Sequence, residues 1–403
     1  MQPTKQVSNR PTSASIRRRV RVIVAFYASS RFGSEYRSGF EFIRFAASLG
    51  FDLAVIADLE QNTRASDLTG MVPGLEVVTI PSPIKKQANL YRYSDFIPQF
   101  IWHSRVGSWL GKHCPGSDVI WVQNGALPWL PVKPYFRHAR TIVWGPVGGG
   151  GHAPAGAIET FDLLARMREW LRNRIERYAI RIKTRQLRRP GVHRVIAMAR
   201  TSDAQHWLRS ALPRMSVPIV PEILDPVPAV RIPRMPVGTP RFLWVGQDVP
   251  RKNLALALTL FERLHSSAFP GATMNVFGCS QGRRPSVSGV TFHGWVGRVD
   301  WESYRADGVL LLTSFREGLP SAVLEAVSRG LLCIASDVGA VSSLGAHTIH
   351  VLPRAEYPHY STETLDHVAE WIKRYLAMEI VEIPAISFRP ALVAHLRAHG
   401  VME

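Results

Sequence analysis

The chain has 403 residues, which is more than one hydrophobic core usually serves and favours two domains of about 150–200 residues each. Hydrophobic residues make up 46% and charged residues 20%, and this composition excludes a disordered or fibrous protein. Because 49 Lys and Arg stand against 31 Asp and Glu, the formal net charge is +18, which favours anionic partners.

Long apolar runs and metal-ligand patterns are both absent from the sequence. No run approaches the roughly 18–20 apolar residues of a membrane-spanning helix, so we expect a cytoplasmic protein. The cysteines at positions 114, 279 and 333 have neither disulfide nor zinc spacing, and the histidines show no metal-ligand spacing. We therefore expect no bound metal.

Residues 1–20 are polar and carry three arginines near their end, so we predict a flexible basic tail. Short runs rich in Val and Ile then alternate with helical stretches in two series. Predicted strands of the first series are 21–26, 53–57, 77–80, 119–122, 141–144 and 193–198. Those of the second are 242–245, 273–277, 290–292, 309–313, 332–335 and 349–352. The repeated βαβα order predicts an α/β protein with two Rossmann-like, doubly wound domains.

A proline-rich stretch separates the two series. Residues 225–240 hold five prolines, which cannot continue a helix or a central strand, so we predict an interdomain linker. The first domain is then 21–224 and the second is 241–375, and we expect the C-terminal segment 376–403 to pack back on the first domain. Ligands of open α/β sheets bind at the carboxyl ends of the strands, so we expect a ligand in a cleft between the domains.

The stretch SFREGLPSAVLEAVSRG, residues 314–330, carries two glutamates eight positions apart. It follows the predicted strand 309–313, and Pro320 suits the first position of a helix that runs to about residue 329. Gly330 suits a left-handed stop after that helix. This geometry places Glu317 in the loop at the carboxyl edge of the sheet and Glu325 inside the helix.

The backbone amides of Ser321, Ala322 and Val323 lie between the two carboxylates, and free amides at a helix N-terminus suit a phosphate. Two carboxylates would repel a phosphate itself, but they suit hydroxyl groups that flank the phosphates. The pattern therefore predicts a nucleotide-sugar site.

The segment EGLPSAVLE resembles the E-x7-E motif of retaining glycosyltransferases with the GT-B fold, in particular family 4 (glycosyltransferase group 1). The resemblance extends to FLWVGQDVPRKNLALAL at 242–258, VTFHGWV at 290–296 and CIASDVGA at 333–340. Two stretches of the first half also match the family. The family's opening loop, helix and second strand resemble GSEYRSGFEFIRFAASLGFDLAVIA at 33–57, and a glycine-rich loop found in one branch resembles WGPVGGGGHAP at 144–154. The resemblance implies two Rossmann-like domains facing across a cleft, the first for the acceptor and the second for the donor.

The resemblance implies a role for each matching residue. Glu317 would orient the donor sugar, and Glu325 would bind the ribose hydroxyls. Lys252, with Arg251 beside it, would neutralise the departing diphosphate. Further nucleotide-sugar contacts would come from Gly33, Gly246, Gly318, Leu319, Ser321 and Ala322. Additional candidates are Asn124, Gly149, Gly150, His152 and Trp295.

The implied activity is retaining, metal-independent transfer of a hexosyl group from a nucleotide sugar, such as a UDP- or GDP-sugar, to a glycan or lipid-linked acceptor. No cofactor is implied. Such an enzyme would act in bacterial surface polysaccharide biosynthesis, in the cytoplasm or peripherally on the inner face of the plasma membrane.

Two positions depart from the family pattern. Gln247 stands where many relatives have an arginine that contacts the diphosphate, and Arg251 could compensate for it. The first domain offers Gln123 and Asn124 where many relatives place a histidine near the donor sugar, and His152 is a candidate for that role. These departures leave open an enzyme of reduced activity. Lys252 could instead be a solvated lysine in a turn, and the glycine run could be a tight turn without a role in ligand binding.

Residues 163–190 hold ten basic and two acidic residues, interleaved with Leu, Ile, Trp and Tyr at helical spacing. Two interpretations stay open: a packed helix with a solvated basic face, or a basic amphipathic surface that docks on anionic lipid. The alternative function is a basic nucleic-acid- or membrane-binding protein on a GT-B scaffold with weak or no transferase activity. No helix-turn-helix, RNP-like or zinc-finger pattern is present, so we expect no nucleic acid partner.

Overall fold

Two compact units divide the chain. The first groups Met1–Gly150, Ile175–Asp225 and Ser387–Glu403, and the second groups Gly151–Arg174 and Pro226–Ile386. The structure, a computed structural model, describes residues 20–26, 28, 34–58, 70, 72–83, 96–123, 133–148, 153–159, 163–187, 194–220, 228–233, 238–282, 286–344 and 347–402.

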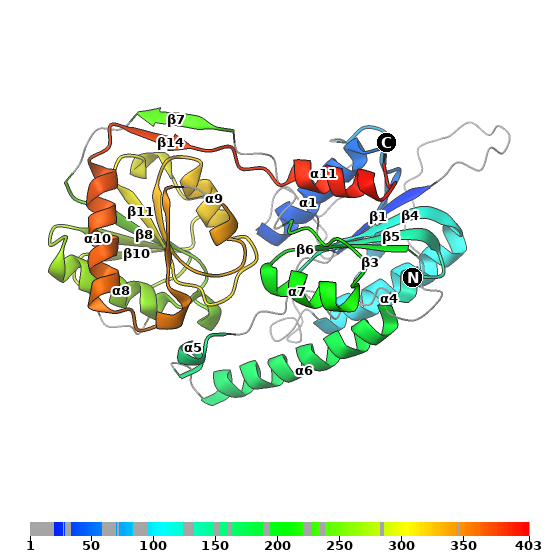
Figure 1. Cartoon of the computed structure of the whole chain (residues 1–403), viewed down its shortest axis with the longest axis horizontal. Helices are drawn as coiled ribbons and strands as arrows, with labels where there is room; N and C mark the ends of the chain where they lie inside the picture. The colour runs from blue at the N-terminus through cyan, green and yellow to red at the C-terminus, as the bar shows by residue number, and fades with distance from the viewer. Residues whose placement is uncertain are drawn as a thin grey trace. The chain divides into compact units, whose positions relative to one another are not determined.

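The first unit is built around a six-stranded parallel sheet in the order β3-β2-β1-β4-β5-β6. Its strands are β1 (Arg21–Ala25), β2 (Leu53–Asp58), β3 (Glu76–Pro81), β4 (Ser117–Val122), β5 (Ala139–Val147) and β6 (Arg194–Ala199). One face of the sheet is covered by α1 (Ser34–Ser48) and α11 (Arg389–Ala398), and the other by α4 (Phe96–His113) and α7 (Ser202–Ala211) (Figure 1).

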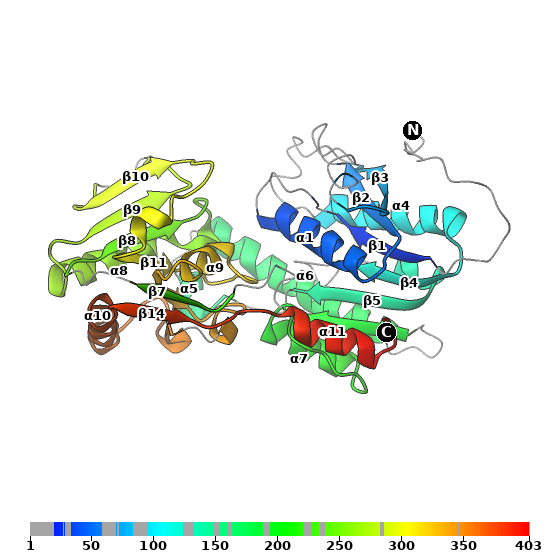
Figure 2. The same cartoon turned by 90° about the horizontal axis from the view of Figure 1, so that it is seen from above.

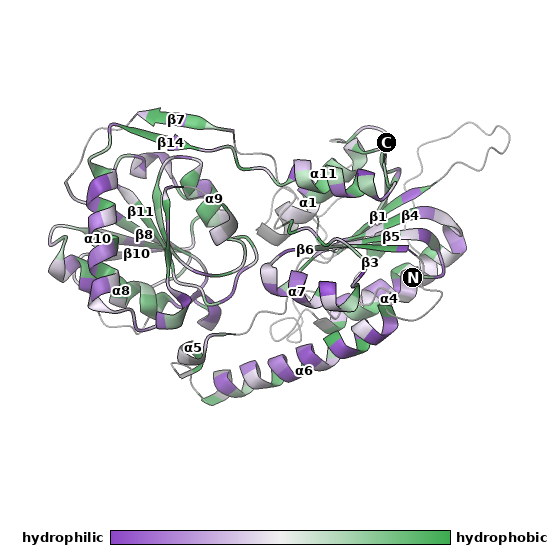
Figure 3. Ribbon diagram, in the orientation of Figure 1, coloured by the Kyte–Doolittle hydropathy of each residue, from purple (hydrophilic) through white to green (hydrophobic). Residues whose placement is uncertain are grey.

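Successive residues of β1 point into different cores, with Val22 in the cluster under α4 and Ile23 in the cluster under α1. Side chains alternate along a strand and both faces of this sheet are covered, so the strand forms a continuous apolar run. Figure 3 shows this hydrophobic character in the strands. Leu392 and Leu396 of α11 lie in the same cluster as Ile23, which ties the end of the chain to the first unit.

The second unit contains a parallel sheet of the same topology, in the order β10-β9-β8-β11-β12-β13. Its strands are β8 (Arg241–Val245), β9 (Thr273–Phe277), β10 (Val290–Gly294), β11 (Gly308–Leu312), β12 (Leu332–Ser336) and β13 (Ile349–Leu352). Figure 2 shows β10, β9 and β8 side by side. Helices α8 (Leu254–Ser267) and α10 (Thr362–Leu376) pack on one face and the short α9 (Ser321–Val327) on the other. Both sheets have the doubly wound 3-2-1-4-5-6 order, which confirms the predicted fold class.

The predicted linker 225–240 contains a strand that the sequence analysis does not predict. This strand, β7 (Val230–Pro233), pairs antiparallel with β14 (Ile380–Ile383) in the second unit. Both strands of a two-stranded sheet are edge strands, where a proline such as Pro233 is tolerated. The C-terminal segment 376–403 therefore divides between the units, with β14 in the second and α11 in the first.

The stretch Gly151–Arg174, predicted as part of the first domain, groups instead with the second unit. The physical reason is packing, because Ala153 and Ala157 belong to the second unit's core cluster. Helix α5 (Ala155–Glu159) lies in this stretch, and the long helix α6 (Leu163–Leu187) contributes residues to both units. Among the described residues, no helix combines the length and apolar character needed to cross a membrane.

One side of α6 buries Glu169, Glu176 and Lys183, which follow one another at intervals of seven residues. The Lys183 ammonium lies 5.5 Å from the centroid of the Trp144 ring. Burial lowers the pKa of Lys183 to about 7. Below that pH the folded protein carries a buried ammonium, which costs free energy.

We predict that Lys183 makes stability rise with pH in the alkaline range. The folded pKa is about 7 against an ordinary 10.5, so the unfolded chain binds more protons between these values and the free energy of unfolding grows by up to about 1.4 kcal/mol per pH unit. Chemical denaturation at pH 7, 8.5 and 10 should show this rise in the wild type and in Lys112→Met, which removes an exposed lysine, but not in Lys183→Met. Equal pH dependence in all three proteins would contradict the assignment.

Candidate functional site

Two loops leave the second sheet at its topological switch point. Strands β8 and β11 are adjacent and parallel, and the chain reverses its order of strands between them. After β8 the chain enters the short turn Pro250–Lys252, and after β11 it enters the loop that carries Glu317. Ligands of open α/β sheets bind at such a point.

Hydrogen bonds between the two loops fix the basic turn. The Thr313 hydroxyl lies 3.1 Å from the Lys252 carbonyl oxygen and 2.8 Å from that of Asn253, and donates toward them. The Phe315 amide donates to the Arg251 carbonyl at 3.0 Å. Asn253 adopts a left-handed φ of 48°, and its side chain accepts a hydrogen bond from the Leu256 amide at the start of α8. The turn after β8 and the end of β11 are therefore held together by backbone atoms as well as by side chains.

The Glu317 carboxylate contacts both cations of the basic turn. Its Oε1 lies 2.6 Å from Lys252 Nζ and 3.1 Å from Arg251 Nη1. The Glu317 side chain is only 10% exposed and that of Lys252 is 18% exposed, whereas Arg251 is 47% exposed. Burial raises the pKa of Glu317, but the charges of Lys252 and Arg251 outweigh it and hold the pKa below its ordinary value. The structure thus brings together an ionised carboxylate, a half-buried ammonium and a more accessible guanidinium.

The start of α9 differs from the prediction in two details. Pro320 is extended and caps the helix, so the helix begins at Ser321 rather than at Pro320. The expectation of a free Val323 amide is wrong, because that amide donates to the Pro320 carbonyl at 3.0 Å, which closes the first turn. The left-handed stop at Gly330 is confirmed by its φ of 80°.

The loop after β12 supports the backbone at Gly318. The Ala340 amide donates to the Gly318 carbonyl at 2.9 Å. Gly339 has a φ of 61°, and a Cβ on this residue would lie 2.0 Å from the Gly318 carbonyl oxygen and 2.5 Å from that of Glu317. Only glycine allows this close approach.

Glu325 is held by a residue that the sequence analysis missed. Trp301 is buried, and its Nε1–H donates to Glu325 Oε2 at 2.9 Å. Trp301 precedes β11 by a few residues and stands far from the glutamate motif in sequence, so no local pattern signals this contact. The pair fixes the direction of a half-buried carboxylate on α9.

The remaining predicted site residues fall into two groups. Gly246 directly follows β8, Leu319 is buried beside α9, Ser321 and Ala322 open α9, and Trp295 follows β10 with 77% of its surface exposed. The others lie outside the described residues: Gly33, Asn124, Gly149, Gly150 and His152. Gln247 is exposed beside the basic turn. Among the described residues, no group of three or more His, Cys, Asp or Glu side chains is arranged to hold a metal ion.

A family model described as "Glycosyl transferases group 1" matches residues 239–363, a stretch that contains the basic turn and both glutamates. A search of curated protein sequences gives no match. The family model thus matches the part of the chain in which Glu317 contacts Lys252 and Arg251.

Solved structures share the fold over most of the chain. Sucrose-phosphate synthase from Thermosynechococcus elongatus has a TM-score of 0.54 and 13% identity, over 89% of this chain and 92% of that one. Alpha,alpha-trehalose 6-phosphate synthase from Burkholderia multivorans has a TM-score of 0.52 and 11% identity, over 94% and 95% of the two chains. The UDP-forming alpha,alpha-trehalose-phosphate synthase from Burkholderia vietnamiensis has a TM-score of 0.50 and 11% identity, over 95% and 98%. These similarities confirm the GT-B fold, and with the family model they support a glycosyltransferase.

We predict that Gly339→Ala destabilises the protein beyond the cost of its backbone conformation. Gly282 has the same φ of 61°, but no described heavy atom lies within 4 Å of a Cβ added there. Both alanine variants should lose about 1–2 kcal/mol from left-handed strain, whereas only Gly339→Ala must also displace the backbone of Glu317 and Gly318. Urea denaturation of the two variants measures the difference. Equal losses would show that the loop yields without cost.

Proposed function

We propose that this protein is a retaining glycosyltransferase that moves a hexosyl group from a nucleotide sugar, such as a UDP- or GDP-sugar, to a glycan or lipid-linked acceptor. The observation that carries the proposal is the contact of Glu317 with Lys252 and Arg251 at the switch point of the second sheet. The family model over residues 239–363 and the GT-B fold of the chain support it. Bacterial surface polysaccharide biosynthesis, in the cytoplasm, is the setting that we propose.

The ionised Glu317 acts in this proposal as a hydrogen-bond acceptor. A carboxylate with a lowered pKa stays charged at neutral pH and cannot donate a proton, so it suits the hydroxyl groups of a sugar. Its contacts with Lys252 and Arg251 also lower the repulsion that a diphosphate would otherwise meet beside a carboxylate. Glu317 therefore orients the donor sugar.

Lys252 and Arg251 supply the positive charge that the departing diphosphate needs. As the bond to the sugar breaks, negative charge grows on the leaving oxygen, and a cation fixed in place before the reaction stabilises that charge. Lys252 is fixed by Glu317 at 2.6 Å and by the backbone contact with Thr313. The more exposed Arg251 adds a second cation, which suits transfer without a metal ion. It would also replace the arginine that many relatives have at the position of Gln247.

Glu325 binds the ribose hydroxyls in this proposal, and its bond from Trp301 keeps one oxygen in place while the other remains for the ligand. Retention at the anomeric carbon follows from the resemblance of EGLPSAVLE to the E-x7-E motif. The acceptor then attacks from the face that the leaving group vacates.

We predict that Lys252→Ala and Glu317→Gln each lower turnover by roughly 100-fold. The first removes the cation that stabilises the leaving diphosphate, and the second removes the carboxylate that orients the sugar and fixes Lys252. Release of UDP or GDP from a panel of nucleotide sugars measures turnover without a known acceptor. Arg374→Ala, on the exposed side of α10, is the control and should keep the wild-type rate. Wild-type rates in both site variants would contradict the assignment of Lys252 and Glu317 to the active site. Binding of nucleic acid but of no nucleotide would favour the alternative function, a nucleic-acid-binding protein.

We predict that Trp301→Phe weakens the affinity for the nucleoside diphosphate by roughly tenfold and leaves kcat unchanged. Phenylalanine keeps an aromatic ring at this buried position but cannot donate the hydrogen bond to Glu325. The free energy of one hydrogen bond to a charged group corresponds to about a tenfold change in affinity. Calorimetry with UDP and GDP measures the affinity. Trp371→Phe, on α10, changes the same residue type away from Glu325 and should bind like the wild type. Unchanged affinity in Trp301→Phe would separate this tryptophan from donor binding.

A further inference from the structure

The helix α6 exposes apolar side chains and buries charged ones, which reverses the usual arrangement of a helix packed on a globular protein. The buried side holds Glu169, Glu176 and Lys183. Between 38% and 73% of the surface of each large apolar residue on the outer side is exposed. These residues are Leu163, Met167, Trp170, Leu171, Ile175, Tyr178 and Ile182.

The exposed apolar residues form one stripe. Apart from the adjacent pair Trp170 and Leu171, they recur at intervals of three and four positions, which places them on the same side of a helix. From Leu163 to Ile182 the stripe runs for about 29 Å at 1.5 Å per residue. A row of large apolar side chains exposed along one helix of a folded protein marks an interaction site. Figure 3 shows hydrophobic and hydrophilic positions alternating along α6.

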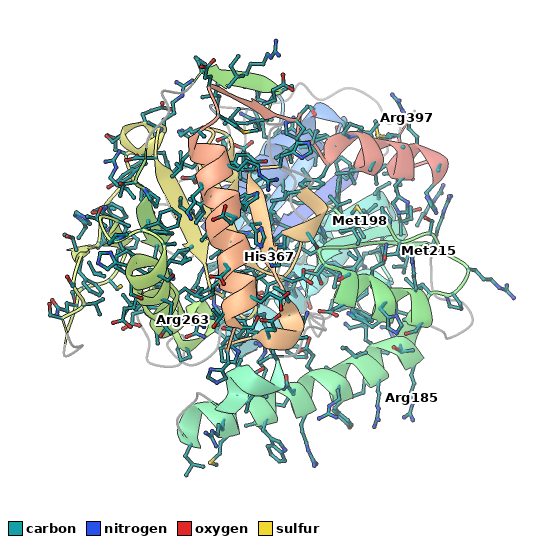
Figure 4. The ribbon with its side chains drawn as sticks, turned by 60° about the vertical axis from the view of Figure 1, so that its left-hand side comes forward. Arg185, Met198, Met215, Arg263, His367 and Arg397 are labelled. Atoms are coloured by element: carbon teal, nitrogen blue, oxygen red, sulfur yellow. The ribbon has the colours of Figure 1, made fainter. Side chains whose placement is uncertain are left out.

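Exposed arginines share the outer half of α6 with the stripe. They are Arg166, Arg174, Arg177, Arg181 and Arg185. Figure 4 shows the labelled Arg185 projecting from the helix. Arg174 lies over the Trp170 ring, with 4.6 Å from its Cζ to the ring centroid. Both acidic residues of α6, Glu169 and Glu176, are buried, so the exposed charge among its described side chains is positive.

The charge decides which partner fits this surface. A second copy of the chain would set arginines against arginines, and like charges in contact are unfavourable. A nucleic acid would pair with the arginines but would leave the apolar stripe in water. An anionic lipid bilayer accepts both groups, because apolar side chains enter the acyl boundary while arginines, Trp and Tyr lie at the headgroups.

We propose that the outer face of α6 is a docking surface for an anionic lipid bilayer, on which the helix lies parallel to the membrane plane. The opposite side of α6 fastens it to the loop of the candidate site. Arg316, the neighbour of Glu317, donates to the two oxygens of Glu169 at 2.5 and 3.4 Å, and both side chains are largely buried. A docked α6 would therefore hold the loop that carries Arg316 and Glu317 near a lipid-linked acceptor. The acceptor rests on the proposed function, whereas the docking surface does not.

Vesicle co-sedimentation tests the docking surface. We expect the wild-type protein to sediment with phosphatidylcholine vesicles that contain about one third phosphatidylglycerol, and not with pure phosphatidylcholine. The double variants Trp170→Ser/Tyr178→Ser and Arg174→Gln/Arg181→Gln should each lose at least tenfold in the bound-to-free ratio. Only the arginine pair should lower the salt dependence of binding, because the apolar pair contributes no charge.

Control variants distinguish binding through α6 from binding through exposed aromatic or basic residues elsewhere on the protein. Phe100→Ser removes an exposed aromatic residue of α4, and Arg374→Gln removes an exposed arginine of α10; both should bind vesicles like the wild type. Circular dichroism checks that each variant is folded. UDP affinity should stay unchanged in all α6 variants, so a failed docking surface and a failed nucleotide site give different results.

Three results would overturn the proposal. One is absence of binding to anionic vesicles at low salt, and another is equal binding by the α6 variants and the controls. The third is a dimer in sedimentation equilibrium that both double variants disrupt, since it would assign the stripe to a second copy of the chain.

Discussion

The ion pair between Lys252 and Glu317 joins two loops that are far apart in sequence, and the candidate site is organised around this contact. A buried carboxylate is costly to desolvate unless a cation offsets its charge, and here Lys252 and Arg251 do so. The pair can form only because β8 and β11 are neighbours in the sheet. The doubly wound order thus creates the site by bringing the carboxyl ends of these two strands to one point.

Supporting contacts turn this pair into a site of fixed geometry. Thr313 binds the carbonyls of the basic turn, and Gly339 allows the loop after β12 to approach the backbone at Gly318. Trp301 fixes Glu325 on α9. The proposed binding of a nucleotide sugar needs such support, because small displacements of the charges in the site would weaken their effect on a transition state.

Part of the chain's positive charge, which totals +18, lies on the exposed side of α6. Composition alone favours anionic partners of any kind, but the exposed stripe that accompanies the arginines narrows the choice to one that also takes up apolar side chains. The buried charges on the other side of the helix are used for internal contacts, such as that between Glu169 and Arg316. The unusual arrangement of α6 therefore has a physical rationale on both of its faces.

The sequence by itself determined the two series of strands, the position of Glu317 in a loop after a strand, and the helix stop at Gly330. These features depend on short-range patterns, namely apolar runs, strand-to-loop spacing and the backbone freedom of glycine. Only the tertiary structure decided that Lys252 and Arg251 reach Glu317, that Trp301 binds Glu325, and that residues 151–174 group with the second unit. These contacts join residues distant in sequence, and their formation depends on strand order and packing, which no local pattern encodes.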